Sequence, residues 1–248
     1  MGVILAWPAL SIGQAAKPAG GPTPATPVLV ELFTSEGCSD CPPADYLLAR
    51  LDAEQPIVGV HVIVLSEHVT YWNHDGWRDP FSLIQMDERQ RHYVEQFRLD
   101  SSYTPQAVID GAEQLVGSDT KHLVQAVANE ARQPSQPVTI TLAALEKGSV
   151  HFTIHAPASQ GDRLVAALAQ DVSRSEVTRG ENAGRTLHHV AVVRGMKQFS
   201  NFDGRELSLS AVNLDRPTGT SATRLVVFLE DPRTGRVVGA AEQTLTNQ

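Results

Sequence analysis

The feature that most constrains this chain is a Cys-Ser-Asp-Cys motif at residues 38–41, which follows one apolar run and precedes a segment with helical spacing. The first run, residues 28–33, contains a single charged residue, Glu31. Apolar residues recur at helical intervals over residues 44–53, and residues 58–65 form a second apolar run. Short continuous apolar runs predict buried strands. The order of strand, motif, helix and strand therefore predicts a βαβ unit with the cysteines at the carboxyl end of its first strand.

The chain has only two cysteines, and a bond between them closes a loop too short to restrain the unfolded chain strongly. Such a pair indicates redox chemistry or metal binding rather than a structural cross-link. In a redox pair the exposed first thiolate attacks, so Cys38 is the predicted nucleophile and Cys41 the resolving residue. The motif also matches half of a zinc site, but without a second Cys-x-x-Cys any metal would need histidine ligands. We expect no bound metal and no cofactor.

A second element of the predicted site is Thr104-Pro105, which comes directly before the predicted strand at residues 107–109. In thioredoxin-like folds a cis proline lies at this place beside the dithiol, where the preceding backbone can pair with an extended substrate. We therefore predict a cis bond between Thr104 and Pro105. The alternative is a trans proline that opens an edge strand, since cis is the minority state of X-Pro bonds.

Charged residues around the motif bear on the acidity of Cys38. Glu31, in an otherwise apolar strand, is a candidate base for the second cysteine; the alternative is a carboxylate that reaches solvent. Asp40 and Glu36 place negative charge near the thiolate and disfavour it. Because proline disfavours helical geometry in the preceding residue, we expect the helix to start near Pro42, where its dipole helps the thiolate less. The sequence thus predicts a reducing rather than an oxidising couple.

Residues 67–81 are rich in aromatic and polar residues without periodicity, and we interpret them as an insertion or lid. Within this segment Tyr71, Trp72 and Trp77 are candidate substrate-binding residues. The later patterns predict helices at residues 82–98 and 119–131 and a hairpin of strands at residues 107–111 and 114–116.

After residue 137 the helical pattern disappears and short alternating segments follow, separated by turn signals. They are residues 138–145, 149–156, 162–171, 185–199, 205–213, 223–230 and 235–245. Antiparallel strands of this length suggest a β-sandwich. The expected fold is thus an α/β thioredoxin-like domain at residues 27–133, followed by an all-β sandwich-like domain at residues 138–248. Residues 1–26 are interpreted as a signal-peptide-like leader and linker.

Composition limits the partners of the chain. The 28 acidic residues outnumber the 20 basic ones, for a net charge of −8, and no basic cluster with interleaved aromatics occurs. Nucleic acid is therefore not an expected partner. The first 16 residues resemble a secretory signal peptide without its basic n-region, which suggests a start within a longer leader. No later segment is long enough to span a bilayer. We expect a periplasmic or secreted protein with no integral membrane segment after leader removal.

Four separated motifs resemble one known family. They are Leu-Phe-Thr-Ser-Glu-Gly-Cys-Ser-Asp-Cys-Pro-Pro-Ala-Asp at residues 32–45, the Tyr-Trp, Gly-Trp and Asp-Pro-Phe elements within residues 71–81, Tyr-Thr-Pro-Gln at residues 103–106 and Gly-Glu-Asn-Ala-Gly-Arg at residues 180–185. Together they resemble the bacterial thioredoxin-like proteins grouped as domain-of-unknown-function family 1223, over nearly everything after the leader. The resemblance implies a thioredoxin-like domain and a β-rich C-terminal part, usually exported, and it implies no activity.

The motif at residues 180–185 combines turn-forming residues with Glu181, Asn182 and Arg185, which can bind or orient polar groups. Asn182 is a candidate substrate-binding residue if this loop packs over the dithiol. The alternative is an ordinary hairpin turn of the sandwich.

The leading functional hypothesis is a thiol–disulfide oxidoreductase that reduces or isomerises disulfides of exported proteins through Cys38 and Cys41. Its partners would be a protein dithiol or disulfide substrate and a separate redox partner. Two alternatives stay open at this point. One is a copper metallochaperone in which a histidine such as His68 joins the two cysteines, since soft thiolates suit Cu(I). The other is a non-catalytic interaction protein that presents the aromatic residues 71–77.

Overall fold

The structure, a computed structural model, describes residues 25–74, 76–146, 149–157, 161–200, 202, 205–210 and 222–245. The predicted leader, and the linker as far as residue 24, lie outside the described residues. In chain order the elements are β1 (Thr26–Thr34), α1 (Pro42–Glu54), β2 (Val60–His68), α2 (Ile84–Phe97), β3 (Gln106–Ile109), β4 (Glu113–Val116), α3 (Thr120–Glu130), β5 (Thr139–Glu146), β6 (Ser149–His155), β7 (Arg163–Glu176), β8 (Thr186–Phe199), β9 (Glu206–Ser210), β10 (Thr223–Glu230) and β11 (Val237–Leu245).

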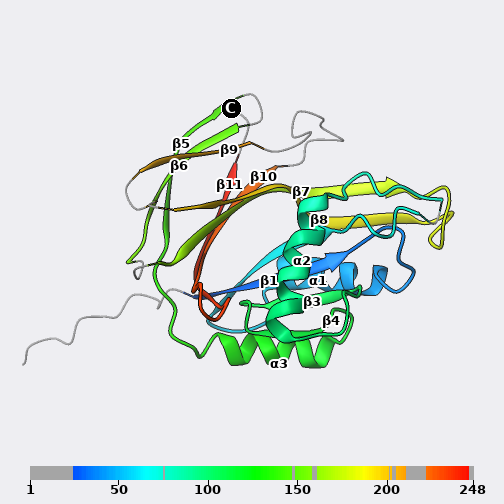
Figure 1. Ribbon diagram of the computed structural model, residues 1–248, viewed down its shortest axis with the longest axis horizontal. Coiled ribbons are helices and arrows are strands. Elements are labelled where there is room, and N and C mark those ends of the chain that lie inside the picture. Colours follow the sequence, from blue (N-terminus) through cyan, green and yellow to red (C-terminus); the bar gives the residue numbers. More distant parts are fainter. Residues whose placement is uncertain are drawn as a thin grey trace, which may run out of the picture.

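The arrangement of the strands overturns the predicted fold class. An eight-stranded mixed sheet has the order β11-β10-β7-β8-β2-β1-β3-β4, and a three-stranded sheet has the order β5-β6-β9 (Figure 1). The prediction of an α/β thioredoxin-like fold followed by a β-sandwich is therefore wrong, because the described chain is mostly β and four later strands extend the sheet begun by the first four. The join is a parallel pairing of β2 with β8, at Ser66 opposite Val192. Alternation in a sequence reveals the faces of a strand but not its neighbour, so this pairing was not predictable.

Most individual elements nevertheless lie where the sequence predicted them. β1 and β2 are parallel with α1 as their connection, and β3 pairs antiparallel with both β1 and β4. α1 begins at Pro42 as expected, with Cys41 as its N-cap residue. α3 has Asp119 as its N-cap residue, whose side chain accepts the amide of His122. The local sequence signals for the strands and for the starts of α1 and α3 are therefore confirmed, whereas α2 begins at Ile84, after the predicted start at residue 82.

Two predicted boundaries concern the segments between these elements. The predicted insertion at residues 67–81 overlaps the end of β2, which continues to His68. Its remaining described residues form turns and irregular structure. Residues 133–137, the predicted linker, connect α3 to β5. The domain boundary placed there stays a prediction.

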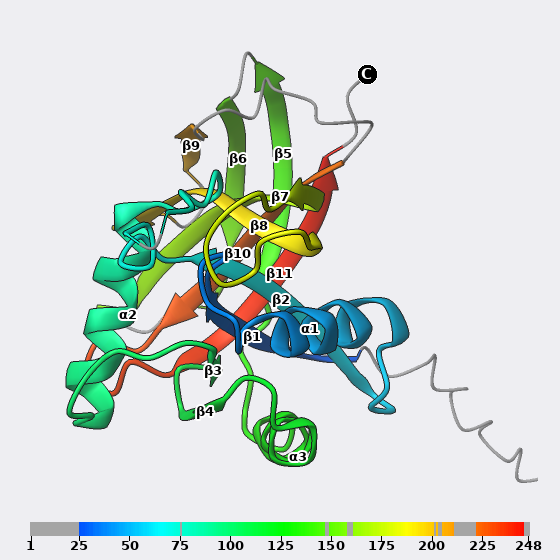
Figure 2. The same ribbon diagram turned by 90° about the vertical axis from the view of Figure 1, so that its right-hand side faces the viewer.

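Alternate residues of the strands that join the two parts of the chain face two different cores. In β10, Val226 and Phe228 belong to the core that surrounds β1, β2 and the helices. Leu225, Val227 and Leu229 of the same strand face a second core shared with the three-stranded sheet. Successive side chains of a strand point to opposite faces, so one sheet layer serves both cores. Figure 2 shows α1 and α2 on opposite sides of β1. Within the described ranges, no helix is long and apolar enough to cross a membrane.

Candidate active site

The two cysteines form a disulfide between the end of β1 and the start of α1. Their Cα atoms are 5.5 Å apart. The carbonyl of Cys41 accepts the amides of Ala44 at 2.9 Å and Asp45 at 3.1 Å, which fixes this cysteine to the first turn of the helix. Cys38 is 1% exposed and Cys41 is 0% exposed. In the disulfide form neither residue is open to solvent, so the exposure expected of the first cysteine is not found.

Thr104 and Pro105 lie beside the disulfide, and the peptide bond between them is cis, as predicted. The Thr104 carbonyl oxygen is 3.9 Å from Cys38 Sγ. The indole Nε1 of Trp72 donates a hydrogen bond of 2.7 Å to Thr104 Oγ1. Trp72 also packs on the loop before the motif, because a Cβ atom added to Gly37 would lie 2.9 Å from Trp72 Cβ. The predicted insertion thus supplies one wall of the dithiol site.

The loop between β7 and β8 supplies a second wall from the other half of the sequence (Figure 2). Asn182 is fully buried, and its Nδ2 donates to the carbonyl oxygens of Glu36 at 2.9 Å and Cys38 at 2.8 Å. Beside it, the carboxylate of Glu181 accepts the amide of Ser39 at 2.9 Å. Asn182 therefore holds the backbone of the dithiol loop in the disulfide form, whereas the sequence predicted that it binds substrate.

A buried polar cluster, which no local sequence motif indicates, lies beside the segment that carries the disulfide. His189 of β8 places Nε2 at 3.3 Å from Glu36 Oε1 and Nδ1 at 3.6 Å from Asp45 Oδ2. Glu36 also accepts the indole N–H of Trp77 at 2.8 Å. Asp45 accepts the hydroxyl of Thr34 at 2.8 Å. The histidine and both carboxylates are buried. Two acids from the first half of the chain and one histidine from the second half thus lie next to the cysteine motif.

His68, the histidine considered for copper binding, pairs with an aspartate. Its Nδ1 is 2.7 Å from Asp79 Oδ2, and the same oxygen accepts the amide of Glu36 at 2.9 Å. Burial alone would raise the pKa of Asp79, but the charge and hydrogen bond of His68 hold that pKa below its usual value. Across the described part of the chain, no group of three or more His, Cys, Asp or Glu residues could hold a metal ion.

Glu31, the predicted base, lies in a different cluster. Its carboxylate accepts hydrogen bonds from Arg89 of α2 and from the Tyr93 hydroxyl at 2.5 Å. Burial alone would raise the pKa of Glu31, but the charge of Arg89 holds it below the usual value. The carboxylates that flank the cysteine motif are those of Glu36 and Asp45.

The three aromatic residues predicted to bind substrate are each held by a polar contact. Trp72 and Trp77 are half-buried, and both donate their indole N–H groups to the site residues named above. Tyr71 is 36% exposed, and its hydroxyl donates to Gln90 Oε1 at 3.0 Å. The structure therefore brings both tryptophans to the dithiol loop and leaves Tyr71 as the most exposed of the three.

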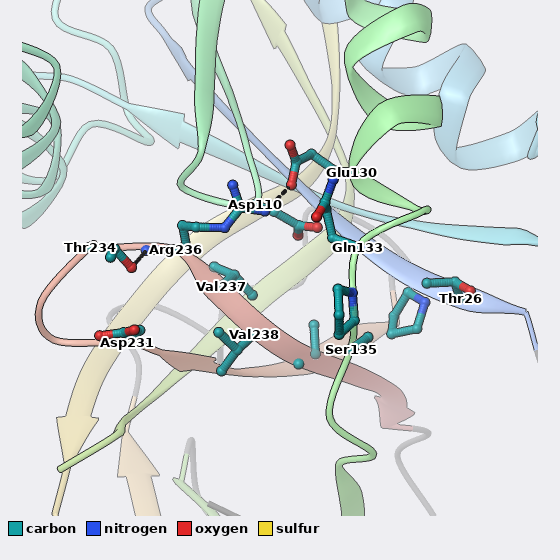
Figure 3. A pocket seen from close by; sticks show the side chains of 14 residues that line it. Thr26, Asp110, Glu130, Gln133, Ser135, Asp231, Thr234, Arg236, Val237 and Val238 are labelled. Atoms are coloured by element: carbon teal, nitrogen blue, oxygen red, sulfur yellow. Dashed lines mark hydrogen bonds and ion pairs between the residues drawn. The ribbon is translucent and has the colours of Figure 1, made fainter. Parts of the chain in front are cut away.

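A cavity of about 290 Å³ lies elsewhere in the fold, lined by the start of β1, the end of α3 and β11 (Figure 3). In it Arg236 pairs with Glu130 at 2.5 Å. The Oδ1 atom of Asp110 accepts the amide of Leu29 at 2.7 Å, and burial raises the pKa of Asp110 to about 7. Neither cysteine lines this cavity. It is therefore separate from the dithiol.

One sequence signal for the missed cluster was present. His188 and His189 are adjacent in β8 and therefore face opposite sides of the strand, and His189 is buried while His188 is exposed. A histidine on a buried face needs polar partners. Its partner Glu36 is 153 residues away in the sequence, so the pattern could indicate the need but not the partner.

Comparisons with known proteins agree with this fold. A crystal structure of protein AGR_C_4864 from Agrobacterium tumefaciens is 25% identical, with a TM-score of 0.66 over 91% of this chain and 97% of that one. HBP35 of Porphyromonas gingivalis is 15% identical, with a TM-score of 0.52 over 90% of this chain and 76% of that one, which is a likeness of fold alone. Curated proteins give no match. The family described as "Protein of unknown function (DUF1223)" matches residues 29–230, so this chain belongs to the DUF1223 family.

Proposed function

We propose that this protein carries out thiol–disulfide exchange with another protein through Cys38 and Cys41. The observation that carries the proposal is the disulfide at the start of α1, with Cys38 Sγ 3.9 Å from the Thr104 carbonyl oxygen. A backbone carbonyl beside a reactive sulfur can accept a hydrogen bond from an extended peptide, as in recognition by strand pairing.

The proposed reaction begins from the reduced protein. The Cys38 thiolate attacks one sulfur of the substrate disulfide, and the other substrate sulfur leaves as a thiolate that takes a proton from water. Cys41 then loses its proton and attacks the Cys38 sulfur of the mixed disulfide, which releases the second substrate thiol. Two electrons pass from the protein dithiol to the substrate disulfide. A dithiol donor must then reduce Cys38–Cys41 again. Because both cysteines are buried as the disulfide, exchange with a partner requires local opening around this site.

The partners are a protein disulfide and a separate redox partner. The site of action is outside the cytoplasm, which the leader-like first 16 residues support, since disulfides persist in oxidising compartments. Finally, we infer a relationship to thioredoxin-like proteins for the part around the dithiol. The order of β1, motif, α1 and β2 and the place of Pro105 before β3 support this relationship, although the fold as a whole differs.

The test compares wild type with Cys38→Ser and Cys41→Ser in reduction of insulin by dithiothreitol, followed as turbidity. We expect wild type to accelerate the reaction and Cys38→Ser to return it to the rate of dithiothreitol alone, because the attacking thiolate is gone. Reduced Cys41→Ser, freed of dithiothreitol and then mixed with insulin, should accumulate a mixed disulfide on Cys38 that is visible by mass spectrometry, because resolution is blocked.

Thermal melts of both variants provide the control, since a loop this short contributes little to stability. Activity that survives Cys38→Ser, or a wild type no faster than dithiothreitol, would argue against exchange chemistry at this site.

A further inference from the structure

A buried histidine behind the dithiol has no part in the exchange reaction described above. His189 is 1% exposed and bridges two carboxylates, with Nε2 3.3 Å from Glu36 Oε1 and Nδ1 3.6 Å from Asp45 Oδ2. These acids flank the cysteine motif in the sequence. Glu36 comes two residues before Cys38, and the amide of Asp45 donates to the Cys41 carbonyl. His189 therefore contacts both ends of the segment that carries the disulfide.

The two carboxylates make this histidine a cation. Burial opposes its charge, but Asp45 and Glu36 raise the pKa of His189 to about 10. A buried carboxylate without a counter-charge is costly, so the imidazolium and the two acids depend on one another.

The other charged or titratable groups around His189 are already paired or are separated from it by a ring. The ring of His68 lies edge-on at 4.6 Å between centroids, and its Nδ1 is bound to Asp79. The Phe81 ring contacts His189 at 5.8 Å, and the Arg194 guanidinium lies over the Phe81 ring at 5.4 Å. The direct electrostatic environment of His189 is therefore set by Glu36 and Asp45.

The charges of His189, Glu36 and Asp45 change the stability of the reduced form of the Cys38–Cys41 pair more than that of the disulfide. The disulfide is neutral, whereas the reduced form carries a thiolate once one of its two thiols has lost a proton to water. Reduction takes two electrons and two protons from a dithiol donor, which becomes a disulfide, and the ionised thiol then returns one proton. A nearby cation stabilises the thiolate-bearing reduced form, and a nearby carboxylate destabilises it.

We propose that the buried imidazolium of His189 is a positioning residue of the dithiol site, which raises the reduction potential of the Cys38–Cys41 pair by offsetting Glu36 and Asp45. The inference rests on the proposed function only in that it concerns the same dithiol. It assigns a residue of β8, from the C-terminal part of the chain, to the redox properties of a motif at the N-terminal end of α1.

The test measures the equilibrium of the full-length protein with glutathione redox buffers, using alkylation and mass spectrometry to count thiols. His189→Gln is expected to shift the equilibrium about tenfold toward the disulfide, which corresponds to a potential about 30 mV more negative. Glu36→Gln is expected to shift it toward the dithiol, because it removes negative charge from the same contact. His122→Gln, at a histidine whose side chain is 70% exposed, serves as the control without a shift.

Shifts of opposite sign in the two variants support the inference, because a general loosening of the fold would move both potentials the same way. Shifts of the same sign, or no shift in folded variants, overturn it. If His189→Gln does not fold, the double variant Glu36→Gln/His189→Gln is compared with Glu36→Gln, and the double variant must have the more negative potential because only it lacks the imidazolium. The readout needs no protein substrate. If the wild type is inactive on insulin but the two variants shift the potential in opposite directions, the proposed function is contradicted and the inference about His189 is supported.

Discussion

Replacing Arg89 with methionine is expected to lower the free energy of unfolding by about 3–5 kcal/mol, because it leaves buried carboxylates without their cation. Arg89 of α2 is the centre of a cluster that joins three strands. It donates to Glu31 of β1 and, at 2.9 Å, to Glu230 of β10, and its Nε is 3.8 Å from Glu67 Oε1 of β2. Burial and the Glu31 charge raise the pKa of Glu67 well above its usual value. Removal of the guanidinium should therefore leave the buried carboxylates of Glu31 and Glu230 without a counter-charge.

Urea unfolding followed by circular dichroism would measure the effect. Glu67→Gln is the matched control in the same cluster. It should raise the free energy of unfolding at neutral pH instead of lowering it, because the raised pKa of Glu67 makes the folded protein hold a proton that the unfolded chain releases. Arg89→Lys should fall between wild type and Arg89→Met, since lysine keeps the charge but not the fork of donors. An Arg89→Met protein as stable as wild type would show that the cluster adds nothing to folding.

Replacing Asp110 with asparagine is expected to stabilise the protein on the order of 4 kcal/mol at pH 8 and hardly at all near pH 4. Burial raises the pKa of Asp110 to about 7 in the folded protein, against a usual value of 3.8. The folded protein therefore keeps a proton that the unfolded chain releases as the pH rises between these values. Stability from this group is complete below the lower pKa and is lost as the pH approaches 7. Because asparagine does not titrate, the Asp110→Asn variant does not lose this stability as the pH rises.

The substitution suits the local backbone. Asp110 has φ 45°, a left-handed conformation that asparagine tolerates, and an amide oxygen can still accept the Leu29 amide. Unfolding free energies of wild type and Asp110→Asn at pH 4, 6 and 8 would give the difference curve, with exposed Asp100→Asn as the control. A difference that does not grow between pH 4 and pH 8 would contradict the raised pKa.

The sequence predicted the positions of strands and helices well, but it did not predict which strands pair with one another. Both results have one physical reason. Alternation marked the strands after residue 137, and Pro42 marked the start of α1, because these signals depend on neighbours in the chain. The fold class was wrong because β2 is followed in the sheet by β8, more than a hundred residues later. A buried apolar strand can pair with any other such strand, so composition and periodicity do not distinguish one joined sheet from two.

For the same reason, only some residues of the candidate site could be identified from the sequence. Cys38, Cys41 and Pro105 could be identified because each belongs to a local motif, and the structure brings them together. Glu36 could be placed near the thiolate from the sequence, but its buried partner could not, because His189 lies 153 residues away. Only the three-dimensional fold shows that Arg89 neutralises Glu31, whereas Glu36 faces His189.

The parallel junction of β2 and β8 also has a consequence for cooperativity. Segments on either side of residue 137 share a sheet, the Arg89–Glu230 ion pair and the hydrogen bonds of Asn182 to the dithiol loop. Neither segment can lose its structure without leaving buried polar groups of the other unpaired. We therefore expect one heat-absorption peak in calorimetry, with a calorimetric enthalpy equal to the van't Hoff enthalpy. The redox motif and the strands that follow it would then melt as a single unit.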